Sequence, residues 1–210
     1  MLRINEIFYS LQGETSRAGL PTVFVRLTGC PLRCGYCDTS YAFNEGMAME
    51  TSAILEQVAA FAPRYVTVTG GEPLAQKECL PLLSALCDAG YSVSLETSGA
   101  LDISKVDPRV SRIVDIKTPG SGEEAKNRWA NLALLTPHDE LKFVICDEAD
   151  YQWARQQLLE HQLGAICPVL FSPVAGVDPG QLADWILRDR LDVRFQIQLH
   201  KLLWREDRGR

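Results

Sequence analysis

Three of the seven cysteines in this 210-residue sequence lie close together near its beginning. Cys30, Cys34 and Cys37 have the spacing C-x3-C-x2-C within the segment LTGCPLRCGYCDTS. Cysteine thiolates bind zinc and iron, and they are also the reactive form of the residue in disulfide exchange. Seven is an odd number of cysteines, and a reducing compartment favours thiols or metal ligands over disulfides. The segment therefore predicts a metal site.

A zinc ion and an iron–sulfur cluster are the two alternatives for this site. A structural zinc ion needs four ligands, typically in two separated pairs, whereas the other cysteines are scattered singly at 79, 87, 146 and 167. A four-iron cluster takes thiolates from one tightly folded loop. Three cysteines for four irons leave one iron open to a small molecule, as the open position does in catalytic zinc sites. The spacing favours the cluster and leaves zinc possible.

The pattern of the chain predicts which elements hold this loop. Short runs rich in β-branched residues predict strands at 22–27, 65–69, 91–96, 112–116, 140–145, 167–172 and 194–199. Apolar residues at helical spacing predict helices at 51–62, 78–89, 148–162 and 179–189. Thr51 or Ser52 is expected to cap the first helix, and Asp178 followed by Pro179 to begin the last.

Alternating strands and helices predict an α/β fold with a mostly parallel sheet. Six or seven strands in 210 residues are too few for a full eight-stranded barrel, so we expect an incomplete TIM-type barrel. A flat doubly wound sheet is the alternative. No repeat or long linker interrupts the sequence, and a single domain is expected over residues 1–210.

The polar and glycine-rich motifs all follow predicted strands. Ligands of parallel α/β proteins bind at the carboxyl ends of the strands. These motifs are the cysteine loop, TGGEP (69–73), ETSG (96–99), DIKTPG (115–120), SPVAG (172–176) and QLHK (198–201). They therefore predict one shared site at one end of the sheet.

Composition excludes several classes of function. The formal net charge of −6 at pH 7 argues against direct nucleic-acid binding. No apolar run approaches the roughly 18 residues that a membrane span requires. Arg3 and Glu6 interrupt the first residues where a signal peptide would be apolar. We expect a cytoplasmic protein.

The cysteine spacing, the aromatic Tyr36 before the last cysteine, and TGGEP together resemble the radical S-adenosylmethionine (SAM) enzymes. In that superfamily the backbone at Gly71 would approach the amino group of the SAM methionine, and glycine suits such close contact. Arg26 before LTGC, together with SLQGE, CDT, ETSG and LHK, resembles the 7-carboxy-7-deazaguanine synthase family in particular. The resemblance divides the single radical-SAM domain into an N-terminal substrate-binding extension, 1–22, and a cluster loop, 28–40.

The resemblance implies a carbon–nitrogen lyase of queuosine biosynthesis. Members convert 6-carboxy-5,6,7,8-tetrahydropterin to 7-carboxy-7-deazaguanine with loss of ammonia. The implied cofactors are a [4Fe–4S] cluster, SAM and Mg2+. The implied partners are the pterin, an electron donor such as a flavodoxin or ferredoxin, and a second copy of the chain in a homodimer. No nucleic acid or membrane is implied.

Site residues carry over from the family one by one. The resemblance assigns the cluster to Cys30, Cys34 and Cys37 and the Mg2+ to Thr39. It assigns SAM contacts to Tyr36, Cys37, Asp38, Gly71, Asp115, Ile116, Lys117, Ser172, Pro173, Val174 and Ala175. It assigns substrate contacts to Gln12, Gly13, Glu14, Arg26, Thr69 and His200. The side chains suit these roles, because a pterin presents a guanidine-like edge of donors and acceptors and its carboxylate needs a cation.

Two other classes of function remain open. A radical-SAM activase that makes a glycyl radical on a partner protein would share the cluster, but it would have no need of SLQGE. A zinc-binding module without catalysis would need only the cysteines. Residues 202–210 extend past the LHK motif, beyond where the family members considered end, and are expected either to fold back or to be disordered.

Overall fold

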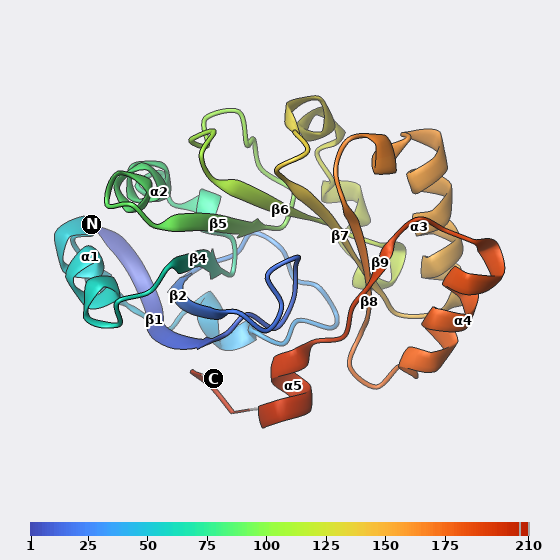
Figure 1. The fold of residues 1–210 in the computed structure, drawn as a ribbon, viewed down its shortest axis with the longest axis horizontal. Helices are drawn as coiled ribbons and strands as arrows, with labels where there is room; N and C mark the ends of the chain where they lie inside the picture. The colour runs from blue at the N-terminus through green and yellow to red at the C-terminus, as the bar shows by residue number, and fades with distance from the viewer. Residues whose placement is uncertain (206, 210) are drawn as a thin grey trace.

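The computed structural model describes residues 1–205 and 207–209, which form one curved sheet of nine strands (Figure 1). The order across the sheet is β3-β1-β2-β4-β5-β6-β7-β8-β9. The strands are β1 (Leu2–Leu11), β2 (Pro21–Leu27), β3 (Met47–Met49), β4 (Tyr65–Gly70), β5 (Ser92–Thr97), β6 (Ser111–Ile116), β7 (Glu140–Ile145), β8 (Val169–Pro173) and β9 (Arg194–Phe195). From β2 to β9 every neighbouring pair is parallel. The predicted α/β fold with a mostly parallel, partial-barrel sheet is confirmed.

Two antiparallel strands at one edge were missed by the sequence analysis. β1 pairs with β2 from Ile4 to Leu11, and β3 pairs with the first residues of β1, Leu2 to Ile4. The segment LRINEIFYSL of β1 mixes polar and apolar residues, and most of its side chains are only partly buried. It lacks the apolar run of a central strand, so the long pairing with β2 stabilises it instead.

Four of the five α-helices agree with the sequence. The helices are α1 (Thr51–Ala60), α2 (Cys79–Asp88), α3 (Glu148–Glu160), α4 (Pro179–Asp189) and α5 (Leu199–Trp204). The predicted cap of α4 is confirmed, since Asp178 Oδ1 accepts the Gly180 N–H at 2.9 Å. The predicted cap of α1 is wrong. Glu50 takes that position in an extended conformation without a side-chain cap, because the backbone is already helical at Thr51.

The last predicted strand is too long. β9 ends at Phe195, and the chain then turns inward and forms α5, which the sequence did not predict. The turn is stabilised by Gln196, whose side chain accepts the Thr15 N–H at 2.8 Å and donates to the Thr15 carbonyl. The Gln196 N–H still donates to the Phe171 carbonyl of β8 at 2.9 Å, and the chain leaves the sheet after this residue.

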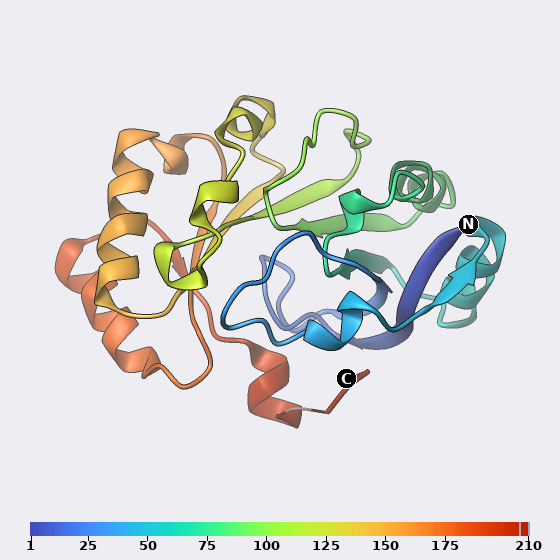
Figure 2. The same cartoon turned by 180° about the vertical axis from the view of Figure 1, so that it is seen from behind.

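Helices α1 to α4 lie along the outer side of the sheet, and α5 lies across its open side (Figures 1 and 2). One hydrophobic cluster joins helices and strands, including Leu82 and Leu86 of α2, Tyr151 of α3 and Phe143 of β7, all fully buried. Each such side chain contributes roughly 1.5–3 kcal/mol of burial free energy. Within the described residues, no helix combines the length and apolarity that crossing a bilayer requires.

The connection between β1 and β2 runs across the open side of the partial barrel. The Ser16 N–H donates to Glu140 of β7 at 3.1 Å, and Arg17 Nη1 donates to the Ser92 carbonyl of β5 at 3.1 Å. Thr15 takes a left-handed conformation with φ of 69°, which is uncommon for a β-branched residue. The connection thus contacts both β5 and β7, which are not neighbours in the sheet. It also places the SLQGE motif in the interior of the partial barrel.

Candidate active site

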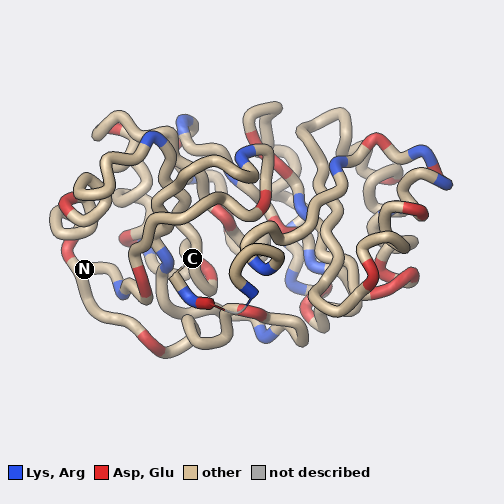
Figure 3. Tube along the Cα trace, turned by 60° about the horizontal axis from the view of Figure 1, so that its bottom comes forward, with Lys and Arg blue, Asp and Glu red and all other residues tan. Residues whose placement is uncertain are grey.

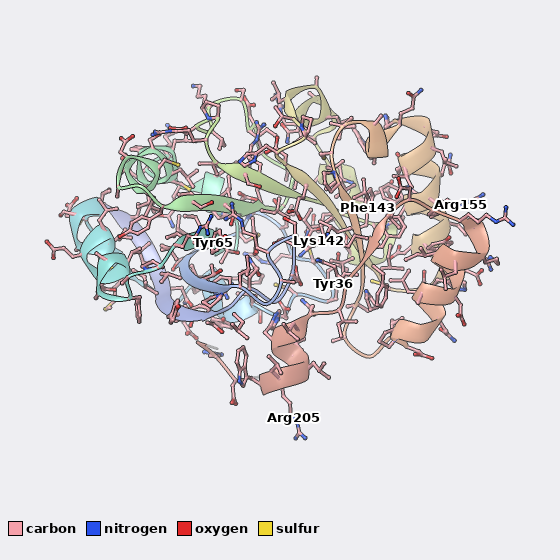
Figure 4. The ribbon with its side chains drawn as sticks, in the orientation of Figure 1. Tyr36, Tyr65, Lys142, Phe143, Arg155 and Arg205 are labelled. Carbon is pink, nitrogen blue, oxygen red and sulfur yellow. The ribbon has the colours of Figure 1, made fainter. Side chains whose placement is uncertain are left out.

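A cavity of about 240 Å³ lies where the parallel strands end. Its walls come from the β1–β2 connection, the cysteine loop and the ends of β4 to β8, and α5 closes one side. The six motifs that follow the predicted strands therefore do meet at one edge of the sheet. Figure 4 places Tyr36 and Lys142 in this interior, whereas Arg155 and Arg205 project from the periphery.

Most of the residues assigned to the site from the sequence line this cavity. They are Gln12, Gly13, Glu14, Arg26, Cys30, Cys34, Tyr36, Cys37, Asp38, Thr39, Thr69, Gly71, Asp115, Lys117, Val174 and His200. Four others do not line it: Ile116 and Pro173 are buried at strand ends, Ser172 donates its hydroxyl to the Gln196 carbonyl, and Ala175 is exposed. For these four, backbone atoms are the available contacts.

The cysteine loop is held by backbone contacts with distant segments. The Gly35 N–H donates to the Ser121 carbonyl at 3.0 Å, and the Gly29 N–H donates to the Ala42 carbonyl at 2.8 Å. Arg33 stacks on the Phe43 ring at 4.4 Å and donates to the Cys30 carbonyl at 2.7 Å. These contacts hold the backbone of the loop in a defined shape.

The TGGEP motif packs directly against this loop. A Cβ atom at Gly71 would lie 2.7 Å from Cys30 Cβ and would also overlap the Gly29 carbonyl. The Glu72 N–H donates to that same carbonyl at 2.8 Å, and the Glu72 carboxylate accepts the Ser98 N–H at 2.7 Å. Gly71 is thus required by its contact with the cysteine loop, a reason additional to the expected approach of SAM.

The cysteines and their neighbours suit a cluster and its small-molecule ligand. Burial raises the pKa of Cys30 and of Cys34, so cluster binding would release thiol protons. Nearby, the Tyr36 hydroxyl and Asp115 Oδ1 are buried without a hydrogen-bond partner among the described residues. Unpaired buried polar atoms are costly, and these two face a cavity in which a polar ligand could pair with them.

Within the described residues, no three histidine, cysteine or acidic side chains are grouped as ligands of one metal ion. A four-iron cluster does not need such a group, because each thiolate binds a different iron atom. The three cysteines line one cavity, and each lies near enough to another to affect a pKa, which is compatible with one shared cluster.

Another part of the cavity wall is a network of polar side chains. Gln12 Nε2 donates to Thr67 Oγ1 at 3.3 Å and to Glu96 Oε1 at 3.2 Å. Thr69 Oγ1 donates to the other Glu96 oxygen at 2.9 Å. Burial raises the pKa of Glu96, and the nearby charge of Glu14 adds to the shift. This wall presents amide, hydroxyl and carboxyl groups to a polar ligand.

The pKa of Glu14 is shifted in the opposite direction to that of Glu96. Lys142 Nζ lies 2.6 Å from Glu14 Oε2, and Gln198 Nε2 donates to Glu14 Oε1 at 2.8 Å. Burial acts to raise the pKa of Glu14, but Lys142, together with smaller effects of Gln198 and His200, outweighs it and the pKa is lowered. Next to Glu14, a Cβ atom at Gly13 would overlap the His200 ring. The SLQGE motif and α5 are therefore in close contact.

Arg26 is oriented by a chain of contacts that reaches the C-terminal tail. Arg26 Nε donates to Glu6 Oε1 at 2.7 Å, and the Tyr41 hydroxyl donates to the same oxygen at 2.9 Å. Arg208 lies 4.0 Å from the centre of the Tyr41 ring and 3.5 Å from Glu45. The described part of the tail folds back, as one of the two sequence-based expectations has it; residues 206 and 210 of that tail lie outside the described residues.

Thr39, the expected Mg2+ ligand, sits beside a carboxylate. The Thr39 hydroxyl donates to Asp38 Oδ1 at 2.8 Å, and Lys201 Nζ lies 2.9 Å from Asp38 Oδ2. Burial acts to raise the pKa of Asp38, but Lys201 outweighs it and the pKa is lowered. A hydroxyl and an ionised carboxylate are oxygen ligands of the kind that Mg2+ prefers, so the donor set fits this ion.

Sequence reasoning missed several residues of the cavity wall. Glu96, Lys142, Gln198 and Lys201 line it without having been assigned a role. Glu96, Gln198 and Lys201 lie within motifs that were recognised as ETSG and QLHK. Lys142 had a signal of a different kind, because ELKFVI places a lysine inside an otherwise apolar strand, where a charge is costly unless it is paired.

The chain was compared with known proteins. A model described as the radical SAM superfamily matches residues 24–158. The chain is 51% identical over 210 residues to the 7-carboxy-7-deazaguanine synthase of Chlorobaculum tepidum, covering 98% of this chain and 96% of that protein. It is 45% identical over 219 residues to the enzyme of the same description from Koribacter versatilis, covering 97% of each.

Among solved structures, QueE from Escherichia coli superposes with a TM-score of 0.76 at 24% sequence identity. The superposition covers 95% of this chain and 94% of that one. At this level of identity the likeness shows the fold, and it agrees with the partial barrel described above.

Proposed function

This chain belongs to the 7-carboxy-7-deazaguanine synthases of the radical SAM superfamily. We propose which residues of its cavity bind the cofactors and which bind the pterin. The enzyme is a carbon–nitrogen lyase that converts 6-carboxy-5,6,7,8-tetrahydropterin to 7-carboxy-7-deazaguanine, in queuosine biosynthesis. The family resemblance read from the sequence is confirmed. The proposal rests on one observation, that the three cysteines and the SLQGE residues line the same cavity.

The cysteine side is where the cofactors belong. Cys30, Cys34 and Cys37 would hold the [4Fe–4S] cluster, and SAM would bind beside it. When bound, these cofactors supply the radical that removes a hydrogen atom from the pterin. The protein contributes shape, because the packing at Gly71 and the backbone hydrogen bonds of the loop keep the thiols in place.

The SAM contacts extend from this side toward the later strands. Tyr36 and Asp115 offer the unpaired hydroxyl and carboxylate oxygen described above, and both are hydrogen-bonding groups that a nucleoside could use. The remaining contacts assigned by resemblance are Cys37, Asp38, Gly71, Ile116, Lys117, Ser172, Pro173, Val174 and Ala175. Those that do not line the cavity would contribute backbone atoms.

The opposite side recognises the pterin. Gln12, the Gly13 backbone and the Glu14 carboxylate face the cavity together and can pair with the guanidine-like edge of the pterin. Arg26, oriented by Glu6, offers its guanidinium to the pterin carboxylate. Thr69 and His200 lie in the same wall as further substrate contacts.

Thr39 is the proposed Mg2+ ligand, with the remaining coordination from substrate oxygens and water. The Thr39→Ala variant should keep its cluster and should lose much of the response of its rate to added Mg2+. An unchanged Mg2+ response in Thr39→Ala would show that this ion, if used, binds elsewhere. The supporting structural feature is the Thr39–Asp38 pair at the cavity wall.

The wider setting follows from the family. We place the enzyme in the cytoplasm, as a homodimer, with a flavodoxin or ferredoxin as electron donor. Basic and acidic residues are interspersed along the trace in Figure 3, and the net charge of −6 gives no support for nucleic-acid binding.

The direct test is anaerobic. Reconstituted protein is analysed for iron and sulfide and is then supplied with carboxypterin, SAM, Mg2+ and a reductant. The proposal expects an iron–sulfur absorbance and conversion of the pterin that depends on SAM and reductant. Zinc in place of iron and sulfide, or an intact cluster without pterin turnover, would contradict it.

A further inference from the structure

Lys142 is a buried cation in the cavity that no sequence motif singles out. It lies in the middle of β7, and only 14% of its side chain is exposed. Figure 4 shows it in the interior, between the sheet and the loops of the open side. A lysine ammonium loses hydration when it is buried inside a strand, which costs free energy. Nearby carboxylates must offset that cost if the lysine is to stay charged in the cavity wall.

The compensation comes from carboxylates on three different elements. Lys142 Nζ lies 2.6 Å from Glu14 Oε2 in the β1–β2 connection and 3.7 Å from Asp115 Oδ2 at the end of β6. Glu96 of β5 adds a third negative charge nearby. Burial acts to lower the pKa of Lys142, but these carboxylates outweigh it and raise the pKa well above its ordinary value. Lys142 therefore remains charged.

The other lysine and arginine side chains that line the cavity form ion pairs with carboxylates other than Glu14. Lys117 pairs with Asp115 at 3.0 Å, Arg26 pairs with Glu6, and Lys201 pairs with Asp38. His200 also faces Glu14, but burial lowers its pKa and favours the neutral ring. Among the described residues, Lys142 is the one lysine or arginine within 4 Å of the Glu14 carboxylate.

We propose that Lys142 is a positioning residue that keeps Glu14 ionised and fixed in orientation for the guanidine-like edge of the pterin. The inference rests on the proposed pterin site and extends it to a residue outside the family motifs. Lys142 holds one oxygen of Glu14 while Gln198 holds the other, so the plane of the carboxylate is set before substrate arrives.

The charge state matters because the pterin edge presents N–H donors. An ionised carboxylate accepts two such hydrogen bonds, whereas a protonated one offers an O–H donor against them. Glu96 stands in the same cavity with its pKa raised. Without the Lys142 ammonium, two buried carboxylates would compete for one proton, and Glu14 would lose its preference for the charged form.

The proposal predicts the direction in which pH changes pterin binding by Lys142→Met. In the wild type the pKa of Glu14 is lowered, so Glu14 stays ionised near neutral pH and acidification to about pH 6 leaves it charged. In Lys142→Met, burial and the nearby Glu96 carboxyl act to raise the pKa of Glu14, and the hydrogen bond from Gln198 opposes them only in part. Glu14 then gains a proton as the pH falls, and pterin binding weakens most at low pH.

The experiment measures pterin binding without turnover. Protein carrying cluster and SAM is titrated with carboxypterin anaerobically and without reductant, at pH 6 to 9, and the ratio of variant Kd to wild-type Kd is compared. Lys142→Met should raise Kd on the order of 100-fold at pH 6 and about 10-fold at pH 9, the size expected for breaking a buried charge pair. Lys142→Arg should return the ratio toward one at every pH, because it restores the positive charge.

Controls separate positioning from damage to the fold. Lys105→Met removes an exposed lysine outside the cavity and should leave Kd unchanged. Iron content and pterin-independent SAM cleavage of Lys142→Met should match the wild type. If Lys142→Met loads no cluster, it is replaced in this test. The double variant Lys142→Met/Glu96→Gln is then titrated with carboxypterin and compared with the single variant Glu96→Gln. The double variant is the safer protein because it buries less unpaired negative charge than Lys142→Met. The inference expects weaker binding in the double variant, and equal Kd values would overturn it.

Two results would overturn the inference directly: equal Kd values for Lys142→Met and wild type across the pH range, or a pH-independent loss that Lys142→Arg does not restore. The second result would assign Lys142 to packing. A wild-type protein that fails to bind carboxypterin would instead overturn the proposed function, so the two failures are distinguishable.

Discussion

The two sides of the cavity are built in opposite ways. On the cysteine side, polar atoms are left unpaired, including three free thiols, the Tyr36 hydroxyl and Asp115 Oδ1. On the pterin side, Glu14 and its neighbours Gln12, Lys142 and Glu96 are already paired with one another. Among the described residues, one side leaves polar atoms with which a ligand can pair, and the other pairs its polar side chains with one another.

This difference follows from what each side binds. Metal–thiolate bonds supply a large binding free energy, so the cysteine loop needs only correct spacing and access. A pterin is recognised by hydrogen bonds whose net free energy is modest, so the partners must be held in place beforehand. The cysteine side is therefore stabilised by backbone contacts and the pterin side by a network of charges.

The largest expected effect comes from removing a cluster ligand. Cys34→Ala should abolish cluster assembly and turnover, because two thiolates cannot hold the four-iron cluster in this loop. Iron and sulfide content measures the effect, and circular dichroism should show an intact fold since backbone contacts hold the loop. Cys87→Ala, in α2, is the matched control and should retain iron; normal iron in Cys34→Ala would contradict the assignment.

The next largest effect separates the pterin side from the cysteine side. Glu14→Gln should raise KM for carboxypterin by about 100-fold, because it removes the charge that faces the pterin edge and leaves Lys142 without its closest partner. Iron content and pterin-independent SAM cleavage should be unchanged. Glu56→Gln, exposed on α1, is the control. An unchanged KM in Glu14→Gln would mean that recognition of the pterin lies elsewhere.

Gly71→Ala tests whether the cysteine side depends on close packing. The added methyl group would meet Cys30 and the Gly29 carbonyl, so the loop must shift. A displacement of this kind should slow SAM cleavage by about tenfold, with KM for the pterin nearly unchanged. Gly164→Ala is the control, because a Cβ atom there meets nothing within 4 Å. Wild-type cleavage rates in Gly71→Ala would show that the loop adapts.

The smallest effect is expected at the tail. Arg208→Ala removes the contact with Tyr41, which orients Arg26 only through Glu6, and the side chain is largely exposed. KM for carboxypterin should rise by about twofold, the size typical of exposed cation–π and ion pairs. The Arg188→Ala variant, at an exposed position on α4, serves as control. A tenfold rise in Arg208→Ala would give the tail a direct part in the site.

Much of the fold was predictable from local pattern. The parallel strands and helices α1 to α4 follow apolar periodicity, which depends on neighbours in the sequence. β1 was missed because its pairing with β2, and not its own composition, stabilises it. The end of β9 was missed because Gln196 bonds to Thr15, a contact between residues far apart in the chain.

By itself, the sequence determined the cysteine side: C-x3-C-x2-C and TGGEP are local patterns whose spacing carries their chemistry. Only the tertiary structure decided the charge states on the pterin side. Burial raises the pKa of Glu96, whereas the pKa of Glu14 is lowered despite its burial because a lysine from β7 lies 2.6 Å from its carboxylate. Electrostatic free energy depends on distance and burial in space, and neither can be read from positions 14, 96 and 142 along the chain.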